Sequence, residues 1–379
     1  FKNDIEQINL LQGKTESILR SELSIVDKIY WSAKYCKKFG TLPFAGIARA
    51  AFIAVQLLQS IQEIGIITQN EYNDFLNSLT TVSSNLSNDR YRLQQKEITK
   101  EAFLEEYGHL RPGTYDILSA RYDENFSEYF DNTDMSNPKE NVVPFSFSKK
   151  QLHKLDEVLL ENGIQINADA LIIFITNSIE SREQAKFIFT KTLSKVLQLT
   201  EEIGNKFNFT RDDMSHLDIQ IILEMSSSVD NRDVPEIFNT NIDRNRTLYE
   251  HTKSVKFPHL ITSAGDIYQY QLSSDEPNYV TLKKVQADIV LEGFLQEKDL
   301  EDKIIFISSA DPGYDYLFTK KIAGLITLYG GANSHMAIRC AELGIPAVIG
   351  AGETNFNKWQ KMKTIIIDPI NKTVTKFHI

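Results

Sequence analysis

Residues 327–350 contain the pattern that most restricts how this chain can fold. The apolar run Ile322–Leu328 predicts a buried strand, and a pair of glycines then ends it. Ser334 occupies the position of an N-cap before a predicted helix over Met336–Leu343, and a Gly-Ile-Pro sequence stops that helix. The apolar residues 347–349 predict a second buried strand. The pattern therefore predicts a strand, a helix and a strand in succession, as in α/β proteins.

His335 is the candidate catalytic residue of this unit. Because it follows Ser334, it lies in the first turn of the predicted helix, where free backbone N–H groups meet the positive end of the helix dipole. That position favours a bound anion, and it places an imidazole beside the anion. The alternative is an ordinary loop between a strand and a helix with His335 as a surface histidine, since short motifs also match by chance.

The sequence around His335 resembles the phosphohistidine swivelling domain of phosphoenolpyruvate-utilising enzymes, a family that includes phosphoenolpyruvate synthase, rifampin phosphotransferase and enzyme I. The shared positions are Thr327, Gly330-Gly331-x-x-Ser334-His335-x-Ala337-Ile338 and Glu342-x-Gly344-Ile345-Pro346-Ala347-Val348-x-Gly350. The resemblance implies that His335 carries a phosphoryl group between two distant sites. It also implies a set of phosphate-supporting residues, namely Thr327, Gly330, Gly331, Asn333, Ser334 and Arg339. The chain departs from the family at Ala341, where many members have arginine.

Hydrophobic spacing divides the chain into two regions. Helical patterns and few glycines predict a large, mainly helical domain over residues 1–257, in which residues 123–150 form an exposed linker or flap. Short β-branched or apolar runs separated by turns predict a small α/β domain over 280–379, with 258–279 as a connector. The expected fold is therefore multidomain, and the resemblance implies that the second domain is a swivelling domain of the β/β/α type.

Titratable side chains concentrate in one loop of the helical region. The sequence Gly108-His109-Leu110-Arg111-Pro112-Gly113-Thr114-Tyr115-Asp116 and the residues after it resemble the acceptor side of rifampin phosphotransferase and related proteins, as does the segment around Arg182. The candidate acceptor-binding residues are His109, Arg111, Asp116, Arg121, Arg182 and Lys186. An imidazole can act as a base, and guanidinium groups bind phosphate or carboxylate. The alternatives are a loop tied down by Arg–Asp pairs and, for the last two residues, a solvated helix face.

Composition limits the partners. The net charge of −10 disfavours nucleic acid and anionic membranes, and no apolar run comes near the ~20 residues of a membrane span. The two cysteines, Cys36 and Cys340, do not suggest a disulfide framework, and the latter is interpreted as a packing residue. No histidine, cysteine or acidic pattern predicts a bound metal. We therefore expect a cytoplasmic protein without nucleic-acid or membrane partners.

The chain has no sequence motif for binding a nucleotide. Because it also begins with Phe1, we expect a fragment that lacks an ATP-grasp domain, which would act upstream in cis or in trans and hold ATP with Mg²⁺. The resemblance implies a dikinase-type phosphotransferase, similar to pyruvate, water dikinase or to rifampin phosphotransferase, with a small-molecule acceptor. Two alternatives stay open, namely a relay to a carrier protein as in enzyme I, and a non-catalytic helical binding module.

Overall fold

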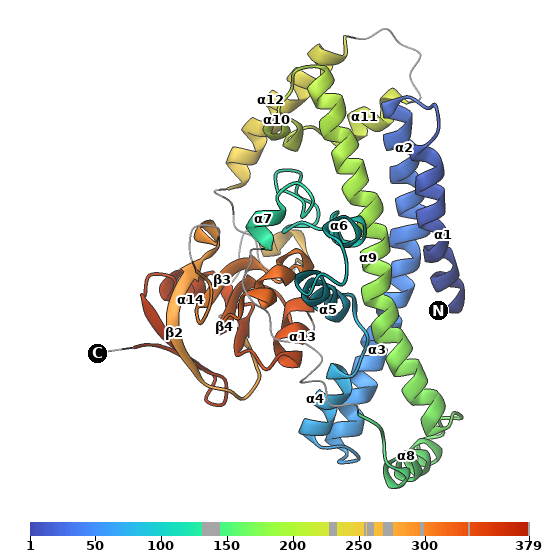
Figure 1. Ribbon diagram of the computed structural model, residues 1–379, viewed down its shortest axis with the longest axis vertical. Coiled ribbons are helices and arrows are strands. Elements are labelled where there is room, and N and C mark those ends of the chain that lie inside the picture. The colour runs from blue at the N-terminus through green and yellow to red at the C-terminus, as the bar shows by residue number, and fades with distance from the viewer. Residues whose placement is uncertain are drawn as a thin grey trace.

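The computed structural model describes residues 1–130, 145–226, 233–253, 255, 261–267, 276–295, 299–332 and 334–377. A helical region is followed by an α/β region, as the sequence predicted. Figure 1 shows the long helix α9 (Ala168–Lys206) running the length of the helical region, with the α/β region against one side. The predicted flap and connector fall partly outside the described residues, and the domain limits stay predictions.

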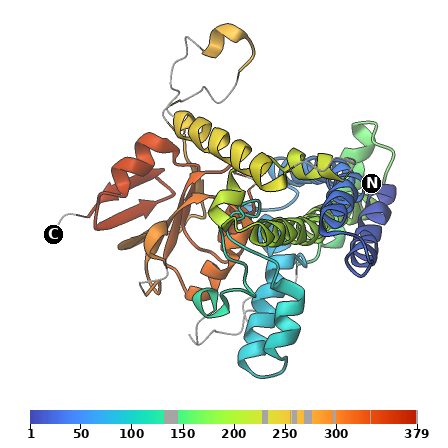
Figure 2. The same cartoon turned by 90° about the horizontal axis from the view of Figure 1, so that it is seen from above.

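The helical region is built around α9. The other helices are α1 (Lys2–Leu19), α2 (Ile25–Tyr35), α3 (Leu42–Glu63), α4 (Gln69–Asn77), α5 (Val82–Gln94), α6 (Lys100–Tyr107), α7 (Phe126–Tyr129), α8 (Lys149–Glu161), α10 (Arg211–Ser215), α11 (Ile219–Met225) and α12 (Val234–Thr252). In Figure 2 the N-terminal helices and α9 are seen nearly end-on as one bundle. α9 is continuous because Leu171, Ile175 and Ile179 keep one buried face at four-residue spacing.

The segment between α1 and α4 contains an unusually apolar helix. α2, a π-helical turn (η1, Cys36–Thr41) and α3 follow one another without a break over Ile25–Glu63, and the most apolar 18-residue window has a mean hydropathy of 1.6. By length and composition alone this helix could cross a membrane, which differs from the sequence-based expectation. Core helices of soluble proteins meet the same criterion, and the absence of a membrane partner stays a prediction.

The α/β region contains a mixed sheet of seven strands in the order β1-β5-β4-β3-β2-β6-β7. The strands are β1 (Asn278–Val280), β2 (Val285–Leu291), β3 (Ile304–Ser309), β4 (Gly324–Tyr329), β5 (Ala347–Ile349), β6 (Thr364–Asp368) and β7 (Thr373–Lys376). The central strands β5, β4, β3 and β2 are parallel, and the outer pairs are antiparallel. The parallel strands β3, β4 and β5 each contain a buried apolar run because both faces of the sheet are covered there.

Alternate residues of β3 supply two separate cores. Ile304 and Phe306 face a cluster that includes α14 (Gly352–Trp359), whereas Ile305 and Ile307 face α13 (His335–Glu342) and η5 (Pro312–Lys320). The second cluster continues into the helical region, so α13 and η5 lie between the sheet and the helices. The helix that carries His335 is therefore at the interface between the two regions.

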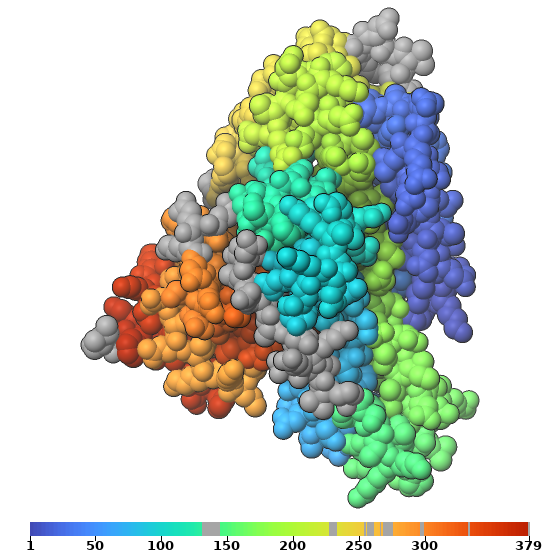
Figure 3. All heavy atoms as spheres, in the orientation of Figure 1, coloured from blue at the N-terminus to red at the C-terminus, as the bar shows by residue number. Residues whose placement is uncertain are grey.

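Apolar and polar contacts join the α/β region to the loop that precedes α7. Tyr122 and Tyr129 pack in one buried cluster with Tyr316, and the Tyr122 hydroxyl donates to the carbonyl of Gly313 over 2.9 Å. Thr114 donates to the Asp311 carboxylate over 3.1 Å. Figure 3 shows this middle part of the chain in direct contact with the C-terminal region. The close fit depends on Gly313, because a Cβ atom there would lie 1.8 Å from the carbonyl oxygen of Arg111.

We expect Gly313→Ala to weaken the packing of the two regions by about 1–3 kcal/mol, the usual cost of overpacking, because the new methyl group meets backbone that cannot move aside. Urea unfolding and hydrogen exchange of the loop around Tyr122 measure this effect. Gly293→Ala is the matched control, since no atom lies within 4 Å of the Cβ position there. Equal stability and equal loop exchange in the two variants would contradict the interface described above.

Candidate active site

The turn that follows β4 is shaped by Thr327 and two glycines. The Thr327 side chain is buried and accepts a hydrogen bond from the Gly350 N–H over 3.0 Å, which ties β4 to the end of β5. Gly330 has a φ of +143°, and a Cβ atom there would lie 2.8 Å from Cβ of Ala310. Only glycine fits this conformation and this space. We call the packing of the α/β region against the helical region in this structure the closed arrangement. In it, the Thr327 hydroxyl stabilises the turn.

The start of α13 follows the sequence-based prediction. Ser334 is the N-cap, and its hydroxyl accepts from the Ala337 N–H over 3.4 Å. Its own N–H donates to the carbonyl of Gly331 over 2.9 Å, so the turn leads directly into the helix. Asn333, a predicted phosphate-supporting residue, lies outside the described residues. His335 is the first residue of α13, which places its imidazole at the N-terminal end of the helix.

Three side chains hold the imidazole of His335, which is only 8% exposed. Nε2 lies 2.6 Å from Oδ1 of Asp315 and 2.9 Å from Oγ of Ser83, and Nδ1 lies 3.0 Å from Oε2 of Glu183. Asp315 belongs to η5 of the same region, whereas Ser83 and Glu183 come from α5 and α9 of the helical region. We name Asp315, Glu183 and Ser83 the His335 cage.

The contacts around the ring shift the pKa of His335 and that of Glu183. Burial alone would lower the pKa of His335, but the charges and hydrogen bonds of Asp315 and Glu183 outweigh it and raise the pKa to about 9. Burial alone would raise the pKa of Glu183, but the hydrogen bond and charge of His335 lower it to about 2. Both shifts describe one arrangement, in which an imidazolium lies between two carboxylates.

Arg339 lies one turn after His335 and faces the helical region. Its guanidinium donates to Glu342 over 2.5 Å and to the Ser87 hydroxyl over 3.1 Å, and it lies over the ring of Phe318 at 5.6 Å. Its Nε atom is buried without a hydrogen-bond partner among the described residues. In this closed arrangement Arg339 therefore joins α13 to α5, and its predicted contact with a phosphate stays a prediction.

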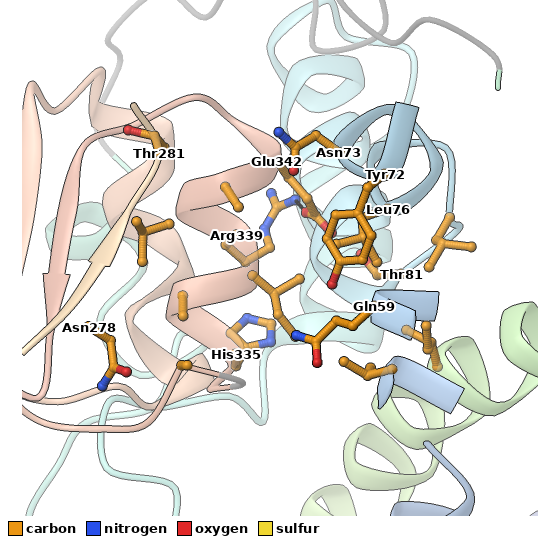
Figure 4. Close-up of a pocket in the computed structure, with 18 of the residues that line it drawn as sticks. Gln59, Tyr72, Asn73, Leu76, Thr81, Asn278, Thr281, His335, Arg339 and Glu342 are labelled. Carbon is orange, nitrogen blue, oxygen red and sulfur yellow. Dashed lines mark hydrogen bonds and ion pairs between the residues drawn. The ribbon is translucent and has the colours of Figure 1, made fainter. Parts of the chain in front are cut away.

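A cavity of about 460 Å³ lies beside His335, between the two regions. Figure 4 shows Gln59 of α3 and Tyr72 of α4 across the cavity from His335 and Arg339 of α13. Its walls combine apolar side chains with polar and charged ones. The lining includes Ala51, Val55, Gln59, Tyr72, Asn73, Leu76, Thr81, Ile179, Arg182, Glu183, Asn278, Thr281, His335, Ile338, Arg339 and Glu342. A cavity of this kind accommodates a small organic molecule.

Two of the predicted acceptor-binding residues lie near this cavity. Arg182 lines it, with its guanidinium 5.2 Å from the ring centre of Phe52 and 3.9 Å from the Glu183 carboxylate. Lys186 lies one turn further along α9, and its charge, like that of Arg182, contributes to the low pKa of Glu183. The two cations therefore flank the carboxylate that holds Nδ1 of His335.

The other four predicted residues belong to the loop before α7, and none of them lines the cavity beside His335. Arg111 is buried and donates to the carbonyls of Asp116 and Ser119 and to the Ser194 hydroxyl. Arg121 forms a two-point pair with Asp123. The side chain of Asp116 caps the turn by accepting from the Leu118 N–H over 2.9 Å. These contacts match the interpretation of a loop fixed by its own polar groups.

His109 occupies a different environment from His335. Its Nδ1 lies 3.1 Å from the Glu106 carbonyl, its ring packs edge-on against Phe187, and burial followed by the charge of Lys191 lowers its pKa to about 3. His109 and Arg121 line a second cavity of about 680 Å³ between α1, α6 and α9. Of the six candidate acceptor residues, Arg182 therefore lines the cavity beside His335, whereas His109 and Arg121 line a different one.

The sequence analysis missed the three residues of the His335 cage. Ser83 and Asp315 lie in segments without a recognisable motif, and they are 252 and 20 positions from His335 in the sequence. Glu183 lies between the predicted residues Arg182 and Lys186, so its position on a cationic stretch of helix was the one available signal. Contacts across such separations depend on how the two regions pack.

Comparison with known proteins identifies the α/β region. Residues 300–371 match the family described as the mobile domain of PEP-utilising enzymes. A stretch of 123 residues is 33% identical to rifampicin phosphotransferase of Bacillus subtilis and covers 30% of this chain. A stretch of 130 residues is 30% identical to rifampicin phosphotransferase of Bacillus cereus. Another of 64 residues, covering 17% of the chain, is 42% identical to phosphoenolpyruvate synthase of Aquifex aeolicus.

The chain therefore carries a mobile domain of the PEP-utilising enzyme family, as the pattern around His335 predicted. The matched stretches span 14% and 15% of the two rifampicin phosphotransferases and 7% of the phosphoenolpyruvate synthase. These relatives are phosphotransferases or synthases by name, which supports the same general kind of activity for this chain. The acceptor and the donor are subjects of the proposal below.

The pKa of His335 predicts how the closed arrangement responds to pH. Because the pKa of His335 is raised from 6.5 to about 9, its imidazolium stabilises the closed arrangement fully below pH 6.5. This stabilisation is lost as the pH rises through about 9. NMR titration of ¹⁵N-labelled imidazole groups measures the midpoint directly. A midpoint for His335 at or below 6.5 would show that the two carboxylates do not hold the ring in solution.

Proposed function

We propose that this chain is the carrier and acceptor-binding part of a dikinase-type phosphotransferase. His335 receives a phosphoryl group from ATP on a separate nucleotide-binding domain and transfers it to a small molecule bound beside it. The single observation that carries the proposal is the cavity of about 460 Å³ that His335 shares with the helical region. The family of the mobile domain and the names of the relatives support the same chemistry.

The residues around the cavity have suitable roles in transfer to a hydroxyl group. The acceptor oxygen attacks phosphorus, the P–N bond to His335 breaks, and its electron pair returns to the ring nitrogen. Glu183 is a carboxylate on the cavity wall and can accept the hydroxyl proton. Arg182 and Lys186 flank it and can balance the negative charge of the phosphoryl group during transfer.

The donor step requires a domain that carries ATP. Magnesium would accompany ATP there, and we propose no ligand for it on this chain. An ATP-grasp domain in cis or in trans is the partner that this proposal needs. Between the two visits of His335 the mobile domain must leave the helical region, because the cage closes both ring nitrogens against the donor.

A cavity lined by both regions favours a small-molecule acceptor over a carrier protein. A relay of the enzyme I kind needs an exposed histidine that a second protein can approach, whereas His335 is buried by α5 and α9. Tyr72 and Gln59 form the far wall of the cavity, so the space beside the ring is bounded by the same chain. The acceptor is accordingly a molecule that enters the cavity from solution.

Replacing His335 with alanine tests the carrier role. We expect His335→Ala to abolish the acid-labile phosphoryl adduct that forms from ATP labelled at the β-phosphate, with an ATP-grasp domain supplied, because no other nitrogen takes its place. Intact-protein mass spectrometry and retention of label measure the adduct. The control is His153→Ala, since His153 is an exposed residue of α8. A full adduct in His335→Ala would eliminate the carrier role.

A bulky residue in the cavity wall tests the acceptor site separately. Asn73 of α4 lines the cavity, so we expect Asn73→Trp to reduce transfer to the acceptor by about 10²-fold, through misplacement of the acceptor, and to leave the phosphohistidine adduct unchanged. Asn70→Trp, at an exposed position of the same helix, is the matched control. Accumulation of phosphohistidine together with acceptor turnover measures both steps. Normal turnover in Asn73→Trp would place the acceptor elsewhere.

A further inference from the structure

Both ring nitrogens of His335 face a carboxylate, and the carboxylates come from different regions. Asp315 lies 2.6 Å from Nε2 and moves with His335, because η5 and α13 belong to the same α/β region. Glu183 lies 3.0 Å from Nδ1 and belongs to α9. Ser83 of α5 bonds to Asp315 and also lies 2.9 Å from Nε2. The Nε2 edge of the ring is therefore held from both regions, and the Nδ1 edge is held by Glu183 of the helical region.

This geometry fixes the state of the imidazole. An ionised carboxylate only accepts hydrogen bonds, so each ring nitrogen must carry a hydrogen to satisfy its partner. An imidazole with two N–H groups is an imidazolium and has no lone pair to attack phosphorus. In the closed arrangement His335 is consequently unreactive as a nucleophile.

A phosphoryl group is incompatible with the same cage. Placed on Nε2, it would occupy the space of the Asp315 carboxylate and Ser83, and placed on Nδ1 it would occupy the space of Glu183. In either case an N–H donor is replaced by an anion that faces a carboxylate at hydrogen-bond distance. Like charges brought together in a buried site repel strongly.

The nearby cations lie on the Glu183 side of the ring, so they do not remove the conflict at Asp315. Arg182 and Lys186 lie near Glu183, and Arg339 is paired with Glu342. Among the described residues, the ion pair of Asp315 is with His335 alone. In the part of the chain that the structure describes, the ion pair of Asp315 therefore depends on the imidazolium of His335.

We propose that Asp315 is a positioning residue that makes the closed cage around the ring specific for the unphosphorylated carrier. Unphosphorylated His335 is held as an imidazolium in the cage, and a phosphoryl group on either nitrogen displaces a carboxylate and opens it. The inference rests on the proposed carrier role of His335. It adds that the cage closes on the unphosphorylated imidazolium and opens when a ring nitrogen carries a phosphoryl group.

The proton balance of transfer agrees with this state. When the acceptor oxygen attacks phosphorus, the P–N bond breaks and its electron pair returns to the ring nitrogen. The other ring nitrogen keeps its N–H throughout, so breaking the P–N bond leaves a neutral imidazole. The proton released by the acceptor hydroxyl then passes through a cage carboxylate to the freed nitrogen and completes the imidazolium. Closure of Asp315 and Glu183 on the ring thus follows transfer, and the ring must lose a proton before it can be phosphorylated again.

Direct chemical phosphorylation tests the inference without any donor domain. Phosphoramidate phosphorylates accessible histidines, and peptide mapping of the full chain gives the rate at each site. His153 is the internal reference because its side chain is 79% exposed. At pH 7 we expect His335 to be labelled about tenfold or more slowly than His153, since its ring is held as the unreactive imidazolium.

Three variants separate the role of Asp315 from a loss of structure. Asp315→Asn should speed labelling of His335 by about tenfold, because the amide holds the imidazolium less strongly, and Asp315→Glu should restore the slow rate. Asp311→Asn is the matched control: it removes the same charge from the start of η5, where Asp311 bonds to Thr114 and not to His335. The rate at His153 should be equal in all of these proteins if they are folded.

Hydrogen exchange of the labelled protein provides the second readout. Once His335 carries a phosphoryl group, exchange of α5 around Ser83 should rise about tenfold, because the cage has opened. Labelling of His335 as fast as His153, or unchanged protection of α5 after labelling, would overturn the inference. These results are independent of the donor step, so they are distinguishable from a failure of ATP to phosphorylate His335.

Discussion

The hydrogen-bonded pairing of His335 with Asp315 and Glu183 is the contact on which the closed structure depends. It lies at the centre of the interface between the helical and α/β regions, and each of the three groups is buried or nearly so. Breaking one side of such a buried pair is costly because it leaves an uncompensated charge. The orientation of α13 against α5 and α9 is therefore linked to the protonation of one imidazole, and the same imidazole is the candidate carrier.

The apolar part of the interface has the opposite character, because it does not respond to charge. Tyr122, Tyr129 and Tyr316 form one buried cluster with the core of the sheet, and burial of apolar area favours closure in every state of the carrier. A mobile domain held only by such contacts would rarely leave, since large apolar interfaces restrict relative motion. Because this apolar interface also contains charged groups, the protonation of His335 can change the stability of the closed arrangement.

The sequence predicted those features that depend on neighbouring residues. The Ser334 cap, the glycine turn and the central strands all follow from local spacing, and the structure confirms them. Helix α5 has a weak local signal because its sequence is rich in serine and asparagine, which favour helices weakly, and it forms through a capping box at Thr81 and burial of Leu86. The short edge strands β1 and β7 also have weak local signals because they depend on pairing with β5 and β6. The cage was missed because its members meet only through tertiary packing.

The two cavities on α9 explain why grouping candidate residues by sequence proximity was insufficient. Arg182 and His109 lie on segments that both resemble acceptor-side sequences, yet they line different cavities. His109 is held neutral by burial and its loop is fixed by Arg111, whereas Arg182 lies beside the carboxylate that touches the carrier. A phosphoryl group must be transferred at contact distance, so only groups on the His335 side of the helix can take part directly. Under the proposed function, position relative to the imidazole therefore favours the cavity beside His335 as the acceptor site.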